Sequence, residues 1–436
     1  MRGARPSGTT SWSAIIPPPC GASSRGSRPK TGKKNKARPD SANRLPGHYR
    51  SREENHVTSQ SMRLMIPGPV DAEDEILAAM AEPTRPHYGK EWMEVYADVV
   101  GSLQEIFQTR ADLFVMPGPG TAGLEAALGS MMRTGEKVLV PRNGFFGHRL
   151  GTVAEGYGLE VCRVDAPQGH PLDPQAIRDA LRQKPDIQAL AVVHLETSTG
   201  VLNPLPEITA VARELEVPII VDAVSSMGGV PVPVDELGID VCVTVANKCL
   251  ASTPGVAPIS VGERAWRQIE ARPDRAHGWY LNLDTWKHYV THWGHWHPYP
   301  TTMPTNVIVA LQASLRRILD GGLEAHYERH RGAARRVRSV LGRLGFELLT
   351  PEAHTSPLLT ALYGLPGMDV EDLRRYLVDE WQILIAGGLE DLSGKILRVG
   401  HIGKAASSDY VEHLLDGVEA YLRLKGYKVP GREPLR

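Results

Sequence analysis

The chain has 436 residues, of which 42% are hydrophobic and 23% are charged, and its formal net charge at pH 7 is −1. This length predicts two or three domains, and the composition is typical of a globular protein with a sizeable core. The near-neutral charge excludes a global electrostatic attraction to nucleic acid or membranes. No apolar run reaches the 18 residues that a membrane-spanning helix needs.

The first 61 residues differ from the rest of the chain. They contain twelve Lys or Arg residues and three acidic residues, a net charge of +9, so the remainder carries about −10. Their Pro, Gly and Ser content, without helical or strand periodicity, predicts disorder. The composition resembles a transit peptide, but the segment could also be an interaction arm, or the functional protein could begin at Met62. A nucleic-acid-binding or scaffold protein that uses this arm is the alternative from another functional class.

From residue 62 to residue 320, apolar strand-like runs alternate with amphipathic helical patterns. Several of the strands are continuous apolar runs, which predicts an α/β domain whose mostly parallel sheet is covered on both faces. The predicted elements, in chain order, are strand Leu113–Met116, helix Ala122–Met132, strands Lys137–Val140 and Leu159–Val164, helix Asp173–Arg182, strand Ile187–His194, helix Pro206–Leu215, and strands Ile219–Asp222 and Ile239–Val245.

The pattern of predicted elements changes near residue 320. Apolar residues at helical spacing predict a helix over Asn306–Leu319, followed by Gly321-Gly322 and a longer helix over Leu323–Leu344. Shorter elements follow, and the last predicted helix is Asp409–Leu424. We therefore expect a large domain at 62–320 and a smaller α+β domain at 321–436.

The four cysteines, Cys20, Cys162, Cys242 and Cys249, form no C-x-x-C pair. This pattern predicts buried, reduced thiols in a cytoplasmic protein rather than a disulfide framework.

Lys248 and Asp222 are the most informative residues, because each follows an apolar strand-like run. Sites in open α/β sheets form at such strand ends. A lysine and an aspartate on neighbouring strands can bind pyridoxal 5′-phosphate. The lysine forms a Schiff base with the aldehyde, and the aspartate keeps the pyridine nitrogen protonated.

A glycine-rich loop, Met116–Gly123, joins a predicted strand to a predicted helix. Backbone N–H groups at Gly120 and the hydroxyl of Thr121 could bind the cofactor phosphate there. The loop is not G-x-G-x-x-G and no Walker lysine follows it, which disfavours a nucleotide site.

Three further segments carry candidate residues. An aromatic in Asn143–Arg149 could stack on a pyridine ring, although Phe145 or Phe146 could equally belong to the core. The hydroxyls of His194–Gly200 could reach the cofactor or simply cap their loop. Arg398, in an apolar strand context, could bind a substrate carboxylate bidentately, with an internal salt bridge as the alternative.

Together these segments resemble the class V aminotransferases of the fold-type I pyridoxal-phosphate enzymes. They are most similar to the alanine–glyoxylate and serine–glyoxylate (serine–pyruvate) enzymes. The resemblance runs from about Leu64 to Leu424. The motifs that carry it are Ile66–Pro69, His194–Gly200, Val221–Ser226, Lys248, Ala386–Leu389 and Leu397–Gly400.

The resemblance implies a seven-stranded, mostly parallel sheet and a homodimer with shared active sites. It makes Lys248 the Schiff-base lysine and proton shuttle, and places Arg398 and Gly68 at the substrate. In such dimers Tyr299 and Thr302 would reach the phosphate of the neighbouring subunit. The implied cofactor-binding positions are Gly120, Thr121, Phe146, Ser198, Asp222, Asn247, Tyr299 and Thr302.

The reaction that the resemblance implies is amino transfer from a small amino acid, such as alanine or serine, to glyoxylate or pyruvate, with ping-pong kinetics. Asn247 precedes the lysine where glyoxylate-using relatives often carry Gln. Asn247-Lys248-Cys249 is similar to the pyridoxamine–pyruvate and 2-aminoethylphosphonate–pyruvate enzymes, so those donors stay open. The stretch Trp293–His297 could shape an unusual pocket, and because no carboxylate or Cys cluster accompanies its histidines, no metal is expected.

Two other reactions are possible on this fold. A cysteine desulfurase needs a mobile nucleophilic cysteine downstream of the lysine, and only Cys249, directly adjacent, is available. Lyase or decarboxylase chemistry with the same cofactor also stays open, because a fold does not determine a reaction.

Overall fold

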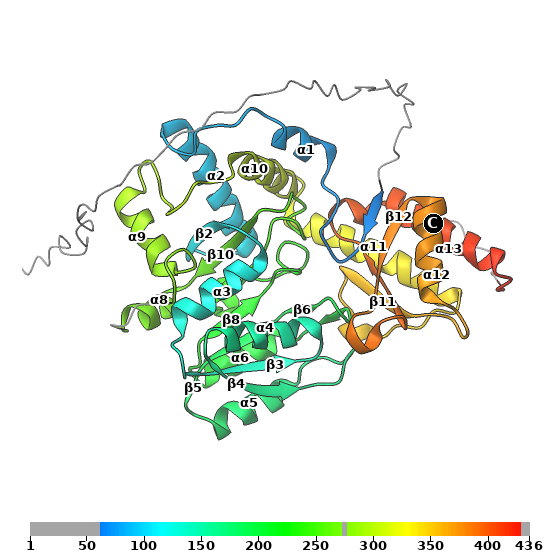
Figure 1. The fold of residues 1–436 in the computed structure, drawn as a ribbon, viewed down its shortest axis with the longest axis horizontal. Coiled ribbons are helices and arrows are strands. Elements are labelled where there is room, and N and C mark those ends of the chain that lie inside the picture. The colour runs from blue at the N-terminus through cyan, green and yellow to red at the C-terminus, as the bar shows by residue number, and fades with distance from the viewer. Residues whose placement is uncertain (1–61, 273–276, 429–436) are drawn as a thin grey trace, which may run out of the picture. The chain divides into compact units, whose positions relative to one another are not determined.

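A computed structural model describes residues 62–272 and 277–428 (Figure 1). The predictions for residues 1–61, including Cys20, lie outside the described residues. The remaining three cysteines are free and buried.

The larger sheet has seven strands in the order β2-β10-β9-β8-β5-β3-β4. Every neighbouring pair is parallel except the two that involve β10, which is antiparallel to both β2 and β9. The predicted mostly parallel α/β sheet is therefore confirmed. The strands are β2 (Asp112–Pro117), β10 (Val256–Val261), β9 (Val241–Val243), β8 (Ile219–Asp222), β5 (Ile187–Val193), β3 (Lys137–Arg142) and β4 (Glu160–Asp165).

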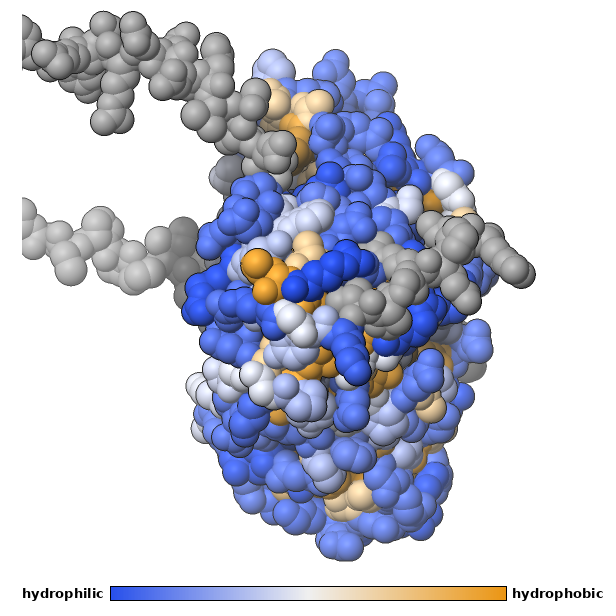
Figure 2. All heavy atoms as spheres, turned by 90° about the vertical axis from the view of Figure 1, so that its right-hand side faces the viewer, coloured by the Kyte–Doolittle hydropathy of each residue, from blue (hydrophilic) through white to orange (hydrophobic). Residues whose placement is uncertain are grey.

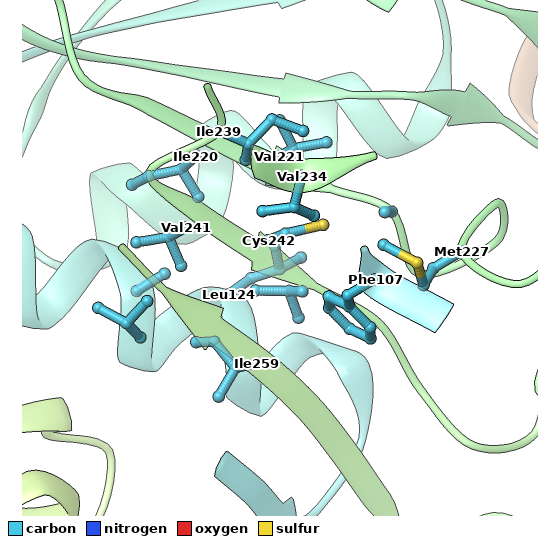
Figure 3. Packing of buried hydrophobic residues seen from close by; sticks show 14 of the residues in the cluster. Phe107, Leu124, Ile220, Val221, Met227, Val234, Ile239, Val241, Cys242 and Ile259 are labelled. Carbon is cyan, nitrogen blue, oxygen red and sulfur yellow. The ribbon is translucent and has the colours of Figure 1, made fainter. Parts of the chain in front are cut away.

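The central strands are apolar along their whole length because helices shield the sheet from solvent. Figure 3 shows this core, where Ile220 and Val221 of β8 and Val241 and Cys242 of β9 pack beside Leu124 of helix α3. The helices of this part of the chain are α1 (Asp74–Met80), α2 (Lys90–Phe107), α3 (Gly120–Met131), α4 (Phe145–Gly156), α5 (Pro174–Gln183), α6 (Leu205–Glu214), α7 (Val234–Leu237), α8 (Glu263–Glu270), α9 (Leu283–Trp293) and α10 (Thr305–Asp320).

A second sheet of four strands has the order β1-β12-β13-β11 and a hydrophobic core of its own. Three strands of this sheet come from the C-terminal part of the chain. The fourth, β1, precedes the seven-stranded sheet in the sequence and pairs in parallel with β12. The predicted boundary at residue 320 stays a prediction, since residues 59–436 form one compact unit. The elements are β1 (Arg63–Met65), β11 (Leu359–Tyr363), β12 (Ile383–Gly387), β13 (Ile396–Gly400), α11 (Leu323–Arg343), α12 (Val370–Trp381) and α13 (Ser408–Leu424).

A short antiparallel ribbon of two strands, β6 (Leu195–Glu196) and β7 (Val201–Leu202), follows β5. The surface on the side of α12 and α13 is mostly hydrophilic, with scattered apolar patches (Figure 2). No helix in the described part of the chain combines the length and the apolar character that crossing a membrane requires.

Candidate active site

A cavity of about 480 Å³ lies where β8 and β9 end and α3 begins. Asp222 is the last residue of β8, in register with Val193 of β5 and Val243 of β9. The predicted residues that line the cavity are Gly120, Thr121, Phe146, Asp222, Asn247 and Lys248. These six residues are up to 128 positions apart in the sequence.

Lys248 lies in the turn that follows β9, and its Nζ donates a hydrogen bond to the carbonyl oxygen of Pro67. Two backbone hydrogen bonds hold the turn that carries Lys248. Val70 N–H donates to Asn247 O at 3.2 Å, and Ala251 N–H donates to Lys248 O at 2.8 Å. Burial lowers the pKa of the Lys248 amine to about 8. A substantial fraction of this amine is therefore neutral, and so nucleophilic, at mildly alkaline pH.

Gly68 touches the lysine directly. A β-carbon at this position would lie 2.4 Å from Cε and 2.5 Å from Nζ of Lys248, and the backbone has a φ of +128°. Both the close approach and the backbone conformation require glycine. The predicted role of Gly68 at the substrate stays a prediction, but the structure shows that Gly68 makes room for the lysine.

Replacing Gly68 by alanine is expected to lower kcat/KM by about 10²-fold, because a shift of roughly 1 Å in a reacting group has an effect of this size. Steady-state kinetics and the cofactor absorbance would measure it. Gly367→Ala tests backbone strain alone, because Gly367 has a φ of +76° and a β-carbon there would have no other atom within 4 Å. Equal activity losses in the two variants would contradict the steric explanation.

Asp222 is buried at the inner end of the cavity. One carboxylate oxygen accepts a hydrogen bond from Val224 N–H at 3.0 Å, and no other donor in the described part of the chain bonds to this carboxylate. Burial raises the pKa of Asp222 to about 6, with a further rise from nearby Glu196. A buried carboxylate with a free acceptor oxygen is suited to a protonated ring nitrogen.

The first turn of α3 forms another wall of the cavity. Its N-cap, Pro119, offers no side-chain cap, and no acidic residue occupies the first turn. The helix N-terminus therefore presents free N–H groups and a positive dipole end to the cavity. A β-carbon at Gly120 would lie 2.6 Å from Val224, so the close packing of this loop requires glycine.

Glu196 organises the side of the cavity that carries Phe146. Its fully buried carboxylate accepts hydrogen bonds from the N–H groups of Phe146 and Gly147, both at 3.0 Å, and from the hydroxyl of Ser198 at 2.5 Å. It thus caps the N-terminus of α4 and fixes the backbone that carries the Phe146 ring. Glu196 had no predicted role of its own, although an acidic residue three positions after an apolar strand was the available signal.

Ser198 does not line the cavity. Its hydroxyl donates to Glu196 and accepts from Phe145 N–H at 3.1 Å, so it supports the α4 N-terminus in this structure. Its predicted contact with the cofactor stays a prediction. Phe145 packs edge-on against Phe146, with ring centroids 5.2 Å apart.

Arg398 lies on β13 and is 7% exposed. Its Nε donates to Gly387 O at 2.6 Å and its Nη1 donates to Thr197 O at 2.8 Å. Burial lowers its pKa to about 10. Within the described ranges no carboxylate forms an ion pair with it, so the internal salt bridge considered from sequence is not formed there. Arg398 is not among the described residues that line the cavity, but its positive charge adds to the lowering of the Lys248 pKa.

Tyr299 and Thr302 lie outside the cavity in this single chain. Tyr299 is fully buried, and its hydroxyl accepts from Trp92 Nε1 at 2.6 Å and donates to His87 O. Thr302 is exposed. Their predicted contact with a partner's phosphate stays a prediction. Trp293 and Trp296 are 42% and 38% exposed and do not line the cavity.

Comparisons with known proteins agree with this geometry. The profile of the aminotransferase class-V family matches residues 72–392. This chain belongs to the class V aminotransferases. It is 37% identical to an uncharacterized aminotransferase of Methanocaldococcus jannaschii, over 84% of this chain and 94% of the relative.

Two further relatives have named activities. The (S)-ureidoglycine–glyoxylate transaminase of Bacillus subtilis is 32% identical, over 82% of this chain and 90% of the relative. The crystal structure of the alanine–glyoxylate aminotransferase of Nostoc sp. aligns with a TM-score of 0.80 at 31% identity, and covers 83% of this chain and 96% of that one.

This aminotransferase therefore depends on pyridoxal 5′-phosphate, and its substrates are amino acids and oxo acids. The residues present fit the cofactor: the cavity has an amine of lowered pKa, a buried carboxylate with a free oxygen and an uncapped helix N-terminus.

Cys249 does not fit desulfurase chemistry. Its thiol is fully buried, donates to Ser225 O at 3.3 Å, and has its pKa raised to about 12 by burial.

Proposed function

We propose that this aminotransferase transfers the amino group of a small amino acid, of the alanine or serine type, to glyoxylate or pyruvate. Glyoxylate is our preferred acceptor because two similar structures with a TM-score of 0.80 carry it in their names, whereas other relatives carry pyruvate in theirs. The observation that carries the proposal is the juxtaposition of Lys248 with Asp222 in one cavity.

In this proposal Lys248 binds the cofactor covalently, Asp222 pairs with its ring nitrogen, and Phe146 lies against its ring. Gly120 and Thr121 bind its phosphate at the N-terminus of α3. Asn247 lines the same wall as Lys248. When bound, pyridoxal phosphate supplies an electron-accepting ring for the amino group under transfer.

Lys248 is the proposed proton carrier at the substrate α-carbon. An amine with a pKa of about 8 exchanges protons readily near neutral pH, which suits a group that must both accept and return a proton. Its hydrogen bond to Pro67 O, together with Gly68, fixes where the amine lies. Proton transfer then depends on the position of this side chain rather than on a further acid or base.

Arg398 is the proposed carboxylate-binding residue. Two of its five N–H groups bond to Gly387 O and Thr197 O, which orients the guanidinium and leaves donors for a carboxylate. Among described residues no anion satisfies these remaining donors. A substrate carboxylate would supply both the missing charge and the missing acceptors.

Arg398→Lys is expected to raise the KM for the oxo acid by about 10-fold or more, because lysine cannot reproduce the forked geometry. Steady-state kinetics would show this, with thermal unfolding used to confirm the fold. Arg374→Lys is the comparison variant, since Arg374 also bonds to a strand carbonyl, Ile385 O, but pairs with Glu371. An unchanged KM in Arg398→Lys would refute the assignment.

We also propose that the enzyme works as a homodimer in which Tyr299 and Thr302 approach the partner's cavity. The support is the spacing of these residues in the family motif. Tyr299 would have to give up its bonds to Trp92 and His87 to do so. Sedimentation analysis of the full chain, with and without cofactor, would test the assembly.

The test of the proposed reaction is an amino-donor screen against glyoxylate and pyruvate. Alanine, serine, aspartate, pyridoxamine and 2-aminoethylphosphonate would be compared by kcat/KM. We expect alanine or serine with glyoxylate to give the highest value. Preference for pyridoxamine or the phosphonate would replace our proposal by one of those activities, and turnover without transfer would indicate lyase or decarboxylase chemistry.

A further inference from the structure

A second cavity, of about 320 Å³, lies behind the turn that carries Lys248. Ala251 lines it from that turn, Ser314 and Arg317 line it from α10, and His326 and Arg329 line it from the first turns of α11. None of its described lining residues belongs to the active-site cavity. It is therefore a separate space that shares one short segment of backbone with the active site.

The charges that line this cavity do not balance. Glu73 is the one carboxylate among the described residues that line it, and Arg317 already binds Glu73 at 3.4 Å while also binding Glu75 at 2.8 Å. No carboxylate in the described ranges forms an ion pair with Arg329. Its Nε is buried without a hydrogen-bond partner in this part of the chain, and its Nη2 donates only to His326 Nδ1, at 3.3 Å.

His326 adds a second unsatisfied donor. Its side chain is 8% exposed, and its Nε2 forms no hydrogen bond among the residues described, although the backbone of Cys249 lies close enough to the ring to raise its pKa. Because Arg329 donates to Nδ1, the proton of the neutral ring must lie on Nε2. Burial lowers the pKa of His326 to about 4, so the ring is neutral at pH 7.

The N-terminus of α11 is a third feature that favours an anion. Its N-cap, Gly322, lines the cavity and offers no side-chain cap, so the first N–H groups of a 21-residue helix lie at this site without a side-chain acceptor. A half-buried guanidinium with a buried Nε, a buried imidazole and a helix N-terminus thus converge, and an anion would offer an acceptor to each of them.

We propose that this cavity is a binding site for a small oxyanion, such as a free phosphate or a carboxylate, held chiefly by Arg329. The cavity volume suits a molecule of a few heavy atoms rather than a nucleotide or a peptide. The site is independent of the amino donor and acceptor proposed above.

Hydrogen bonds connect residues that line this cavity to the turn that carries Lys248. Ser314 donates to Leu250 O at 2.6 Å, and Ala251, which lines the cavity, donates its N–H to Lys248 O. Ala251 has a φ of +52°, an uncommon conformation for a residue with a side chain. An anion beside Ala251 would therefore stiffen the turn that holds Lys248.

Isothermal titration of the holoenzyme with inorganic phosphate would test this site. In the proposed holoenzyme the cofactor phosphate occupies the N-terminus of α3, but Arg398 stays open to anions, so only binding that is lost on changing Arg329 reports on the second cavity. We expect one saturable site per chain in the wild type. Arg329→Gln should weaken phosphate binding by about 10-fold or more. Arg329→Lys keeps the charge but loses the planar set of N–H donors, so its affinity should be intermediate. A parallel titration with acetate distinguishes a phosphate site from a carboxylate site.

Arg316→Gln is the matched control, because Arg316 is on α10 one residue from Arg317 but is exposed and pairs with Asp98. It should bind phosphate like the wild type. Without phosphate, Arg329→Gln should have a melting temperature at or above that of the wild type, because a half-buried cation without an ion-pair partner in the described ranges has been removed. Absence of saturable binding of both anions to the wild type, or unchanged binding in a folded Arg329→Gln variant, would overturn the proposal.

Discussion

Replacing Lys248 by alanine is expected to lower the turnover number by about 10⁴-fold or more, because both covalent binding of the cofactor and proton transfer are lost together. Among the described residues that line the active-site cavity, Lys248 is the one lysine, and burial lowers its pKa to about 8. Steady-state kinetics would give the loss of turnover. Borohydride reduction followed by peptide mass spectrometry would show whether the adduct on this residue has disappeared.

Lys395→Ala is the control for this variant, because Lys395 is exposed and directly precedes β13 in the four-stranded sheet, outside the cavity. It should retain wild-type turnover and the trapped adduct. Activity close to the wild-type value in Lys248→Ala, or an adduct on another lysine, would end the assignment of the cofactor to this cavity.

Asp222→Asn is expected to lower kcat by about 10³-fold, the effect of removing one preorganised charge from a buried reaction site. The same substitution should weaken cofactor binding by about 10-fold or more, since a charge-assisted hydrogen bond is lost. Titration of the apoenzyme with pyridoxal phosphate would give the affinity. Asp186→Asn, at an exposed carboxylate that pairs with Lys137, should leave both quantities unchanged.

The stability of the same variant has a predictable sign. The pKa of Asp222 is raised to about 6, so the folded apoenzyme holds this proton more strongly than the unfolded chain does. Its stabilising contribution is present at pH values below about 4 and is lost as the pH rises through about 6. At pH 8 the Asn variant of the apoenzyme should therefore be more stable than the wild type, by up to about 3 kcal/mol. Denaturant unfolding of the apo proteins at pH 5 and pH 8 would check this, and a lower stability of the variant at pH 8 would contradict it.

The residues at strand ends could be predicted from sequence. Asp222 and Lys248 stand out because each follows a continuous apolar run, and the order of strands in the sheet then brings them into one cavity. The helices α10, α11 and α13 were also predictable, since their apolar residues recur at helical spacing over 16 or more residues.

Other parts depend on contacts that no local pattern reveals. Helix α4 was not predicted, because it contains Gly147, Gly151 and Gly156 and its N-terminus is capped by Glu196, about 50 residues away. Strand β10 was not predicted either, and its antiparallel pairing with both β9 and β2 is not evident from its composition. The contact between Gly68 and Lys248 joins residues 180 positions apart.

The short path of the chain through β1 ties the two sheets together mechanically. Residues 63–65 are paired with β12, and within a few residues the same backbone bonds to Lys248 through Pro67 and to Asn247 through Val70. A rotation of the smaller sheet would therefore be transmitted to the Lys248 amine, because only Ile66 separates the paired strand from Pro67. A truncated protein that begins after residue 70 would lose this tether even though every described residue that lines the cavity remained.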